Sequence, residues 1–295
     1  MKSTIPRPFY FLKRLVQRFL DDDISALSAE STYYFILGLI PFLIFFANAL
    51  LFFAAPQVEW ILRLLHYLPA DVATAMEENI YRILQARSSL WMTVGLLTAL
   101  WTSSQGVDTL IRGMDHIFYG NRNTQSYVVV KGKSLIFTVM LSVTMIVSLV
   151  LMVFGNALVY GAAAYFTIPA FFLDVWVIAK YGIPFIMIAL SLAGFYYLAP
   201  SGRHRSWTKI LTSAFLTTFL WIGVNSAYGY YILHISSMGL TYGSLIGMIV
   251  LFLWFHLTAM VILLGGEIMM AWEETFEQGK QVAQGSHGSH GGSLQ

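Results

Sequence analysis

Six long apolar stretches alternate with short polar segments along this chain. They cover about residues 33–55, 90–110, 134–156, 175–198, 210–232 and 244–270. Each stretch is close to the roughly 20 apolar residues that a helix needs to cross the hydrocarbon core of a bilayer. The pattern therefore predicts an all-α integral membrane protein with a six-helix transmembrane domain over residues 33–272. The 90–110 stretch fits this pattern least well, because its C-terminal half is polar.

The composition supports lipid as the solvent of this chain. Hydrophobic residues make up 57% of the sequence and charged residues only 11%, whereas soluble domains carry about 25% charged residues. The sequence contains no cysteine, which excludes disulfides, thiolate metal sites and a thiol nucleophile. A cleavable signal peptide is not expected, because the first apolar stretch is too long and begins after residue 30.

The positive charges alternate between the polar segments. Thirteen of the 17 lysines and arginines lie before the first stretch, between the second and third, between the fourth and fifth, or after the sixth. Lys and Arg are enriched in the cytoplasmic loops of membrane proteins. The alternation predicts an even number of spans in a bacterial plasma (inner) membrane, with both termini in the cytoplasm.

Three segments lie outside the predicted spans. Residues 1–32 form a cytoplasmic arm, in which residues 8–20 predict an interfacial amphipathic helix with its basic side chains toward anionic headgroups. Residues 56–88 predict a short helical segment on the external side. The tail, residues 273–295, is rich in Gly, Ser and His and is expected to be disordered. We expect no native metal site there.

A stripe of polar residues ends the second apolar stretch. Steps of three and four residues place its members on one helix face. Asp108 and Arg112 are one turn apart and can pair, and Arg112 could instead hold an anionic group such as a phosphate. A structural ion pair at the membrane interface is the competing interpretation. The candidate substrate-binding residues of the stripe are Trp101, Ser104, Gln105, Asp108, Arg112 and Asp115.

Ionisable residues near membrane spans are candidates for proton coupling, because they are costly in lipid. Glu30 precedes the first stretch and shares a helix face with Tyr34, a candidate substrate-binding residue. Glu267 follows two glycines near the end of the last stretch, and His256 lies three helical turns before it. Each of these ionisable groups could equally be a structural group at a helix end.

Two prolines and one asparagine complete the candidate set. Pro41 and Pro184 lie inside apolar stretches, where proline kinks a helix and could provide a hinge. Asn225 lies in the fifth stretch and could bind substrate, although polar residues in spans most often serve helix packing. The sequence has no HExxH, Walker or GxSxG motif. No cofactor, no nucleic-acid partner and no enzymatic activity are expected.

Three segments give the chain a family resemblance: DDDISALSAESTYYFILGLIPFLI at 21–44, LWTSSQGVDTLIRGMDHIFY at 100–119, and LTYGSLIGMIVLFLWFHLTAMVILLGGEI at 240–268. In these segments the chain resembles the YihY/BrkB family of bacterial inner-membrane proteins. The second segment looks like the version found in Gram-positive members. Gly266 replaces the usual alanine, and Glu30 departs from the small or amide residue common at its position.

The resemblance implies a six-helix membrane fold and a role in envelope lipid traffic. Members of the family were once labelled ribonuclease BN, which looks like a misassignment. We expect a transporter or flippase for a lipid or lipid-linked anionic substrate, not driven by ATP. The alternatives are a non-catalytic scaffold or envelope-assembly partner and, with least support, a lipid enzyme. Its partners would be membrane lipids, and could include an envelope protein or further copies of the chain.

Overall fold

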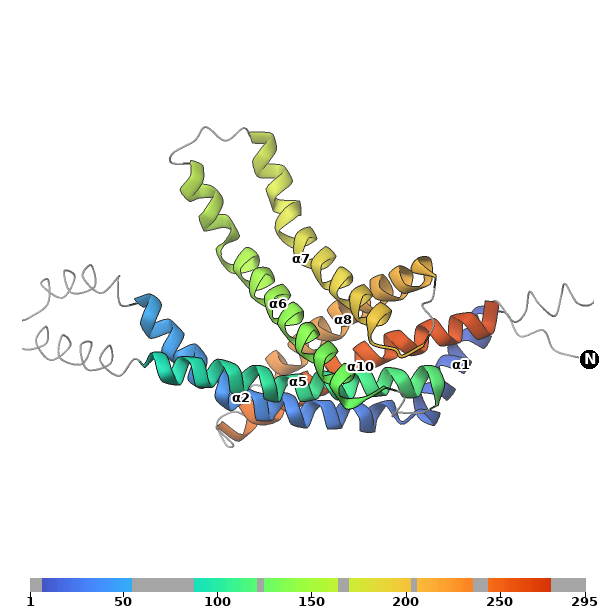
Figure 1. Ribbon diagram of the computed structural model, residues 1–295. Coiled ribbons are helices and arrows are strands. Elements are labelled where there is room, and N and C mark those ends of the chain that lie inside the picture. The colour runs from blue at the N-terminus through green and yellow to red at the C-terminus, as the bar shows by residue number, and fades with distance from the viewer. Residues whose placement is uncertain are drawn as a thin grey trace, which may run out of the picture. The chain divides into compact units, whose positions relative to one another are not determined.

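The computed structural model describes residues 7–54, 88–120, 125–163, 170–202, 206–235 and 244–276. Within these residues it contains helices and no strand, as predicted (Figure 1). The helices are α1 (Arg7–Asp21), α2 (Ile24–Ala54), α5 (Ser89–Tyr119), α6 (Tyr127–Ala163), α7 (Ala170–Leu198), α8 (Trp207–Ile235) and α10 (Ser244–Phe276).

Five of the described helices are long and apolar enough to cross a membrane. The candidate spans are Ile24–Ala49, Tyr127–Met152, Ile178–Leu198, Trp207–His234 and Ile246–Thr275. The chain is a multi-pass membrane protein, and five of the six predicted spans match one of these candidate spans. The 90–110 stretch lies inside α5, a helix of 31 residues. Because α5 carries the polar stripe, it is not among these candidates, and a sixth span stays a prediction.

The helices extend beyond the apolar stretches that predicted them. Helix α2 begins at Ile24, α6 begins at Tyr127, and α10 continues to Phe276. Helix ends depend on local hydrogen bonds and turns, which hydropathy does not report. At the start of α2, for example, Asp23 has a positive φ of 49° and its carbonyl accepts the N–H groups of Ala26 and Leu27. The predicted external segment and most of the tail lie outside the described residues.

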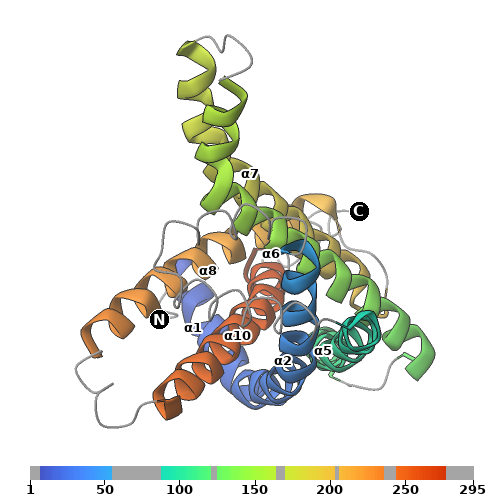
Figure 2. The ribbon, with the colours of Figure 1, turned by 90° about the vertical axis from the view of Figure 1, so that its left-hand side faces the viewer.

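The chain divides into two compact units. The first comprises residues 1–32 and 106–295, and the second comprises residues 33–105. In the first unit α6 and α7 lie side by side, as do α7 and α8, α8 and α10, and α1 and α10 (Figures 1 and 2). Phe137 meets Phe195 edge to face between α6 and α7, with ring centroids 5.2 Å apart. Phe11 of α1 meets Trp272 of α10 in the same way.

In the second unit, the later part of α2 packs closely against the first part of α5. A Cβ atom added at Gly95 would lie 2.8 Å from the backbone nitrogen of Phe45 and 3.1 Å from the carbonyl oxygen of Pro41. The side-chain oxygen of Asn48 accepts the N–H of Ser88 at 3.0 Å. Gly95 therefore permits a backbone contact that any larger residue would prevent. Pro41, a predicted hinge, lies at this contact.

Candidate functional site

The first charged cluster joins the end of α5 to the start of α6 and the end of α7. We call Asp108, Arg112, Asp115, Gln125, Lys131 and Lys133 the α5–α6 cluster. Arg112 donates from Nε to Oδ1 of Asp108 at 2.9 Å, across one helical turn. The predicted Asp108–Arg112 pair is therefore confirmed. Asp108 is buried, whereas the Arg112 side chain is 26% exposed.

Asp115 links α5 to the residues that follow α7. It is fully buried and accepts hydrogen bonds from the backbone N–H of Ser201 at 2.8 Å and from the Gln125 amide at 2.9 Å. Gln125 also donates to the carbonyl of Ala199 and accepts from Nζ of Lys133 at 2.6 Å. Asp115 thus organises a polar junction, a role that its position on the stripe did not predict.

The α5–α6 cluster carries more positive than negative charge. Lys131 is buried at the start of α6 and is attracted to Asp108, and Lys133 belongs to the Gln125 junction. With Arg112, the cluster holds three cations against two carboxylates. Partly buried charge is stable only with a counter-charge or water close by. This excess suits the cluster to an anionic group.

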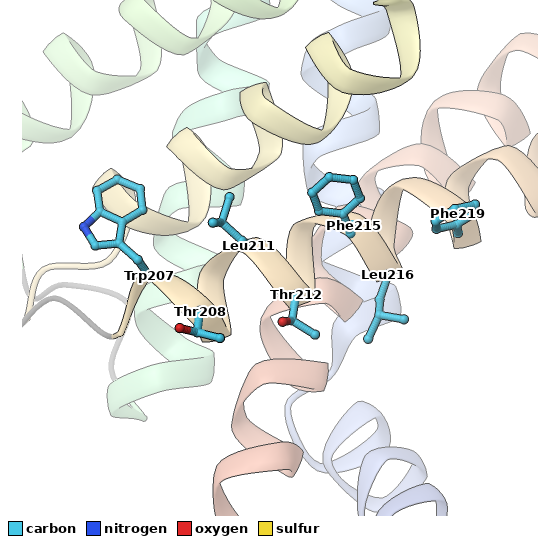
Figure 3. Close-up of a pocket in the computed structure, with 7 residues that line it drawn as sticks. All are labelled: Trp207, Thr208, Leu211, Thr212, Phe215, Leu216 and Phe219. Atoms are coloured by element: carbon cyan, nitrogen blue, oxygen red, sulfur yellow. The ribbon is translucent and has the colours of Figure 1, made fainter. Parts of the chain in front are cut away.

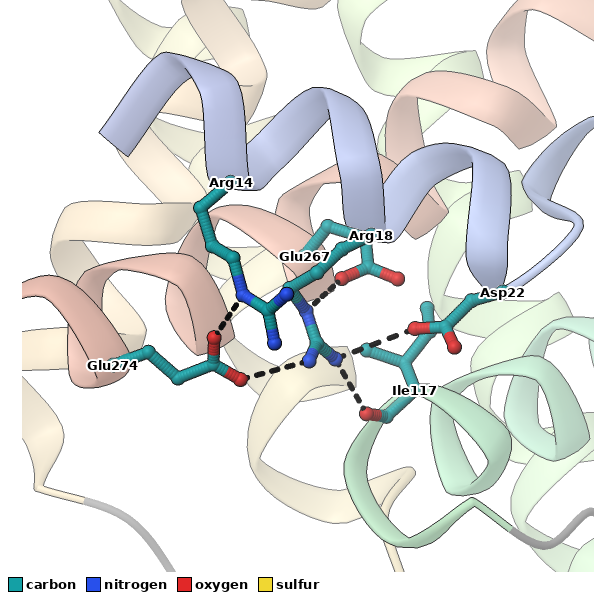
Figure 4. A network of polar contacts seen from close by, with 6 residues as sticks. All are labelled: Arg14, Arg18, Asp22, Ile117, Glu267 and Glu274. Atoms are coloured by element: carbon teal, nitrogen blue, oxygen red, sulfur yellow. Dashed lines mark hydrogen bonds and ion pairs between the residues drawn. The ribbon is translucent and has the colours of Figure 1, made fainter. Parts of the chain in front are cut away.

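The second charged cluster fastens α1 to α10 (Figure 4). We call Arg14, Arg18, Asp22, Glu267 and Glu274 the Arg18 cluster. Arg18 donates from Nε to Glu267 at 2.6 Å, from Nη1 to Glu274 at 2.9 Å, and from Nη2 to Asp22 at 3.3 Å. Nη2 also reaches the carbonyl oxygen of Ile117, at the end of α5, at 3.0 Å. One guanidinium therefore contacts three carboxylates.

Glu274 bridges the two arginines of α1. Its second oxygen accepts from Nε of Arg14 at 2.5 Å. This hydrogen bond raises the pKa of the Arg14 guanidinium, a group that is charged at physiological pH even without this partner. The prediction that the bases of this helix face headgroups is wrong for Arg14 and Arg18, because α10 supplies carboxylates that the local sequence of α1 does not reveal.

Glu267 is fully buried because α10 packs closely on its neighbours just before it. A Cβ atom at Gly265 would collide with the hydroxyl groups of Tyr196 and Thr217, and one at Gly266 would lie 2.9 Å from Met114. Glycines in membrane helices permit such close approach. The two glycines thus bring Glu267 inside the first unit, where Arg18 is its cationic partner.

A family comparison covers both clusters. The family model described as "Virulence factor BrkB" matches residues 15–287. This chain belongs to the BrkB family of membrane proteins. The match includes Arg18, Arg112 and Glu267 as well as the three segments that carried the resemblance.

Two known proteins are similar in sequence to this BrkB-family chain. It is 30% identical over 258 residues to YfkH of Bacillus subtilis (strain 168), whose name calls it ribonuclease-like, covering 88% of this chain and 93% of the relative. It is also 30% identical over 105 residues to a UPF0761 membrane protein of Kangiella koreensis, covering 36% of this chain and 26% of that relative. No solved structure matches the chain.

The remaining stripe residues of this BrkB-family chain lie in the second unit. Trp101 is exposed, Gln105 is half-buried, and Ser104 is buried with its hydroxyl donating to the carbonyl of Trp101 at 2.7 Å. Only the later residues of the stripe, Asp108, Arg112 and Asp115, belong to the α5–α6 cluster.

The other predicted residues are dispersed along the helices. Glu30 is exposed, and the ring of Tyr34 meets that of Tyr33 edge to face. Asn225 accepts from the indole of Trp254 at 2.7 Å and donates to a carbonyl of its own helix, which favours a packing role. His256 stacks on Phe252 rather than joining the Arg18 cluster. Pro184 lies inside α7.

Sequence reasoning missed the cations of the Arg18 cluster and, apart from Arg112, those of the α5–α6 cluster. Arg18 and Asp22 are one turn apart on the arm, and this spacing was the available local signal. The partners of Arg18 lie about 250 positions away, however, so no local pattern identified them. Lys131 and Lys133 were counted only as loop charges, but both lie on α6.

An apolar groove on α8 was also missed (Figure 3). It has a volume of about 470 Å³. Tyr197 of α7 stacks on Trp207 at one end, with ring centroids 4.5 Å apart, and Phe185 of α7 meets Phe219 at the other end, at 4.8 Å. A groove of this size and lining suits an acyl or isoprenoid chain. It is lined by Trp207, Thr208, Leu211, Thr212, Phe215, Leu216 and Phe219.

Proposed function

We propose that this chain binds the headgroup of an anionic lipid, or of a lipid-linked anion, at the α5–α6 cluster and moves it across a bacterial plasma membrane. The observation that carries the proposal is the excess of cations in that cluster, where Arg112, Lys131 and Lys133 face two carboxylates. Arginine binds phosphate through paired N–H groups, and a partly buried site strengthens such contacts.

The groove on α8 supports a lipid rather than a soluble anion. A site that binds a lipid must accommodate both a charged headgroup and apolar chains. The first unit of this chain offers both a cationic cluster and a groove lined by three aromatic and two leucine side chains beside two threonines. The sequence contains no Walker motif, so we propose movement that is passive or coupled to an ion gradient.

The orientation belongs to the same proposal. With both termini in the cytoplasm, as the charge pattern predicts, the α5–α6 cluster faces the cytoplasmic leaflet. A headgroup bound there would enter from the cytoplasmic leaflet.

A flux experiment in reconstituted vesicles tests the proposal. The purified full chain is placed in vesicles with labelled phospholipids or isoprenoid-linked phosphates, and transbilayer movement is followed with and without a proton gradient. Replacing Arg112 by alanine should reduce the rate about tenfold or more, since a hydrogen bond to a charged group contributes about 1.5–3 kcal/mol. The matched control is Lys180→Ala, which removes a cation of α7 that lies over the ring of Tyr181.

Two outcomes would reject the proposal. One is a folded wild-type protein that moves none of the lipid classes. The other is an Arg112→Ala protein that keeps the wild-type rate, which would mean that the pair with Asp108 is structural. If Lys180→Ala reduced lipid movement as much as Arg112→Ala does, the result would also count against the site. Lipid movement would then not depend specifically on the α5–α6 cluster.

A scaffold role is the second candidate, and the exposed face of α1 favours it. Phe9, Leu12, Val16 and Leu20 recur at steps of three and four residues, and each side chain is at least half exposed. Such a stripe can contact a protein partner or the membrane interface. Photo-crosslinking from Leu12 in native membranes distinguishes the two: adducts with one protein support a scaffold, whereas adducts with lipid alone do not.

A further inference from the structure

The two carboxylate oxygens of Glu267 have unequal surroundings. Oε2 accepts from Nε of Arg18 at 2.6 Å. Oε1 is buried and has no hydrogen-bond partner among the residues that the structure describes. An ionised carboxylate buried in this way loses its water without full compensation, at a cost of several kcal/mol. One oxygen of Glu267 therefore lacks the donor that an ionised group needs.

Helices α5, α7 and α8 contribute polar groups to the surroundings of Glu267. Helix α5 contributes the Ile117 carbonyl, and α7 contributes the Tyr196 hydroxyl, which donates to the carbonyl of Ile262. Lys209 of α8 pairs with Glu273 of α10 at 3.7 Å. The groups in direct contact leave two cations against three carboxylates: Arg14, Arg18, Asp22, Glu267 and Glu274.

Asp22 is the acid that faces Glu267. The two carboxyl groups interact with each other, and both contact the same guanidinium (Figure 4). Two ionised carboxylates carry like charges and can only accept hydrogen bonds, so they repel each other. A single proton placed between them removes the repulsion, supplies the missing donor and makes the cluster electrically neutral.

We propose that Glu267 and Asp22 hold one proton between them, so that the Arg18 cluster is a proton-binding site at the contact between α1 and α10. When the proton is present, Arg18 and Arg14 balance the remaining two negative charges. When it leaves, a third negative charge stays in the cluster and weakens the attachment of α1. The site goes beyond the proposed function, since a transporter or a scaffold could use it.

A bound monovalent cation is the competing explanation of the charge imbalance. It is disfavoured because the guanidinium of Arg18 already lies among the three carboxylates and would repel a second cation. The test therefore compares sodium, potassium and pH as separate variables. If the hydrogen exchange of α1 changed with the sodium concentration at constant pH, the proton site would be overturned.

Infrared spectroscopy of the full chain in lipid nanodiscs detects the proton directly. A protonated carboxyl group has a C=O band separate from that of carboxylates, and ¹³C labelling of glutamate or aspartate carboxyls identifies which residue type carries it. We expect such a band in the wild-type protein near neutral pH and its loss in Glu267→Gln. The matched control is Glu30→Gln, which removes an exposed acid of α2 and should leave the band unchanged.

Glu267→Gln is expected to fold, because a glutamine amide can accept from Arg18 and donate toward Asp22 as the protonated acid would. Asp22→Asn provides a second variant, since it removes the other half of the pair and should also abolish the band. A wild-type spectrum without a protonated carboxyl band overturns the proposal. A band that persists in both variants overturns it as well.

Hydrogen exchange of α1 tests the consequence for the helix contact. At each pH, the hydrogen-exchange rate of the α1 amides in wild type is divided by the rate of the same amides in Glu267→Gln. This ratio cancels the intrinsic pH dependence of amide exchange. We expect this ratio to rise as pH rises, because only the wild-type cluster gains a negative charge. A ratio that stays constant with pH would show that no proton at this site holds α1.

Discussion

Replacing Arg18 by alanine should weaken the first unit more than any other single loss of a charge on α1. The Arg18 side chain is only 12% exposed, and its partner Glu267 is fully buried. The substitution leaves Glu267 without its cation and removes the contacts to Asp22, Glu274 and the Ile117 carbonyl. Breaking a buried ion pair by removing one partner costs about 3–5 kcal/mol.

The lower end of that range is expected here, because a carboxyl group left without its cation can take up a proton. Equilibrium unfolding in mixed micelles measures the loss. Arg14→Ala is the matched control: it lies on the same helix, is 35% exposed and contacts one carboxylate, Glu274. Because exposed ion pairs contribute at most about 1 kcal/mol, the control should lose no more than that.

A double variant separates the buried charge from other effects. Adding Glu267→Gln to Arg18→Ala removes the carboxylate that the first change left alone, so part of the stability should return. The reasoning would be refuted if Arg18→Ala lost no more stability than Arg14→Ala. It would also be refuted if the double variant were less stable than Arg18→Ala, because Glu267 would then stabilise the fold without its cation.

Three further predictions concern packing within the first unit. Gly265→Ala should cost about 1–3 kcal/mol through overpacking, whereas Gly223→Ala, where an added Cβ meets nothing within 4 Å, should leave the unfolding free energy nearly unchanged. Thr144→Val removes the 2.9 Å hydroxyl contact with Ser191 between α6 and α7 and should cost about 0.6 kcal/mol. Asn225→Leu leaves a tryptophan indole without its acceptor and should cost about 1–3 kcal/mol in the same unfolding assay.

Much of the fold follows from properties that act locally along the chain. Apolar stretches of sufficient length predict membrane helices, because a bilayer leaves the backbone few other ways to satisfy its hydrogen bonds. The pair formed by Asp108 and Arg112 was predictable for the same local reason, since residues four apart meet on a helix. Helix ends were less predictable, as Asp23 illustrates, because one turn conformation places the start of α2.

The partners of Arg18 could not be predicted from a single sequence. A basic residue on an amphipathic helix beside a membrane has two favourable partners, a lipid phosphate or a buried carboxylate, and the helix pattern is the same for both. Only the packing of α1 on α10 decides between them. Likewise, Gln125 joins Asp115 to Lys133 from a position outside any helix, so no periodicity predicted its role.

The rate at which an anionic and a zwitterionic lipid with identical chains cross vesicles containing this protein tests the central claim most directly. The excess positive charge of the α5–α6 cluster predicts faster movement of the anionic lipid, with the difference decreasing as salt screens the headgroup. Equal rates for the two lipids, or no movement of either by folded protein, would contradict the claim that this cluster selects and moves an anionic headgroup.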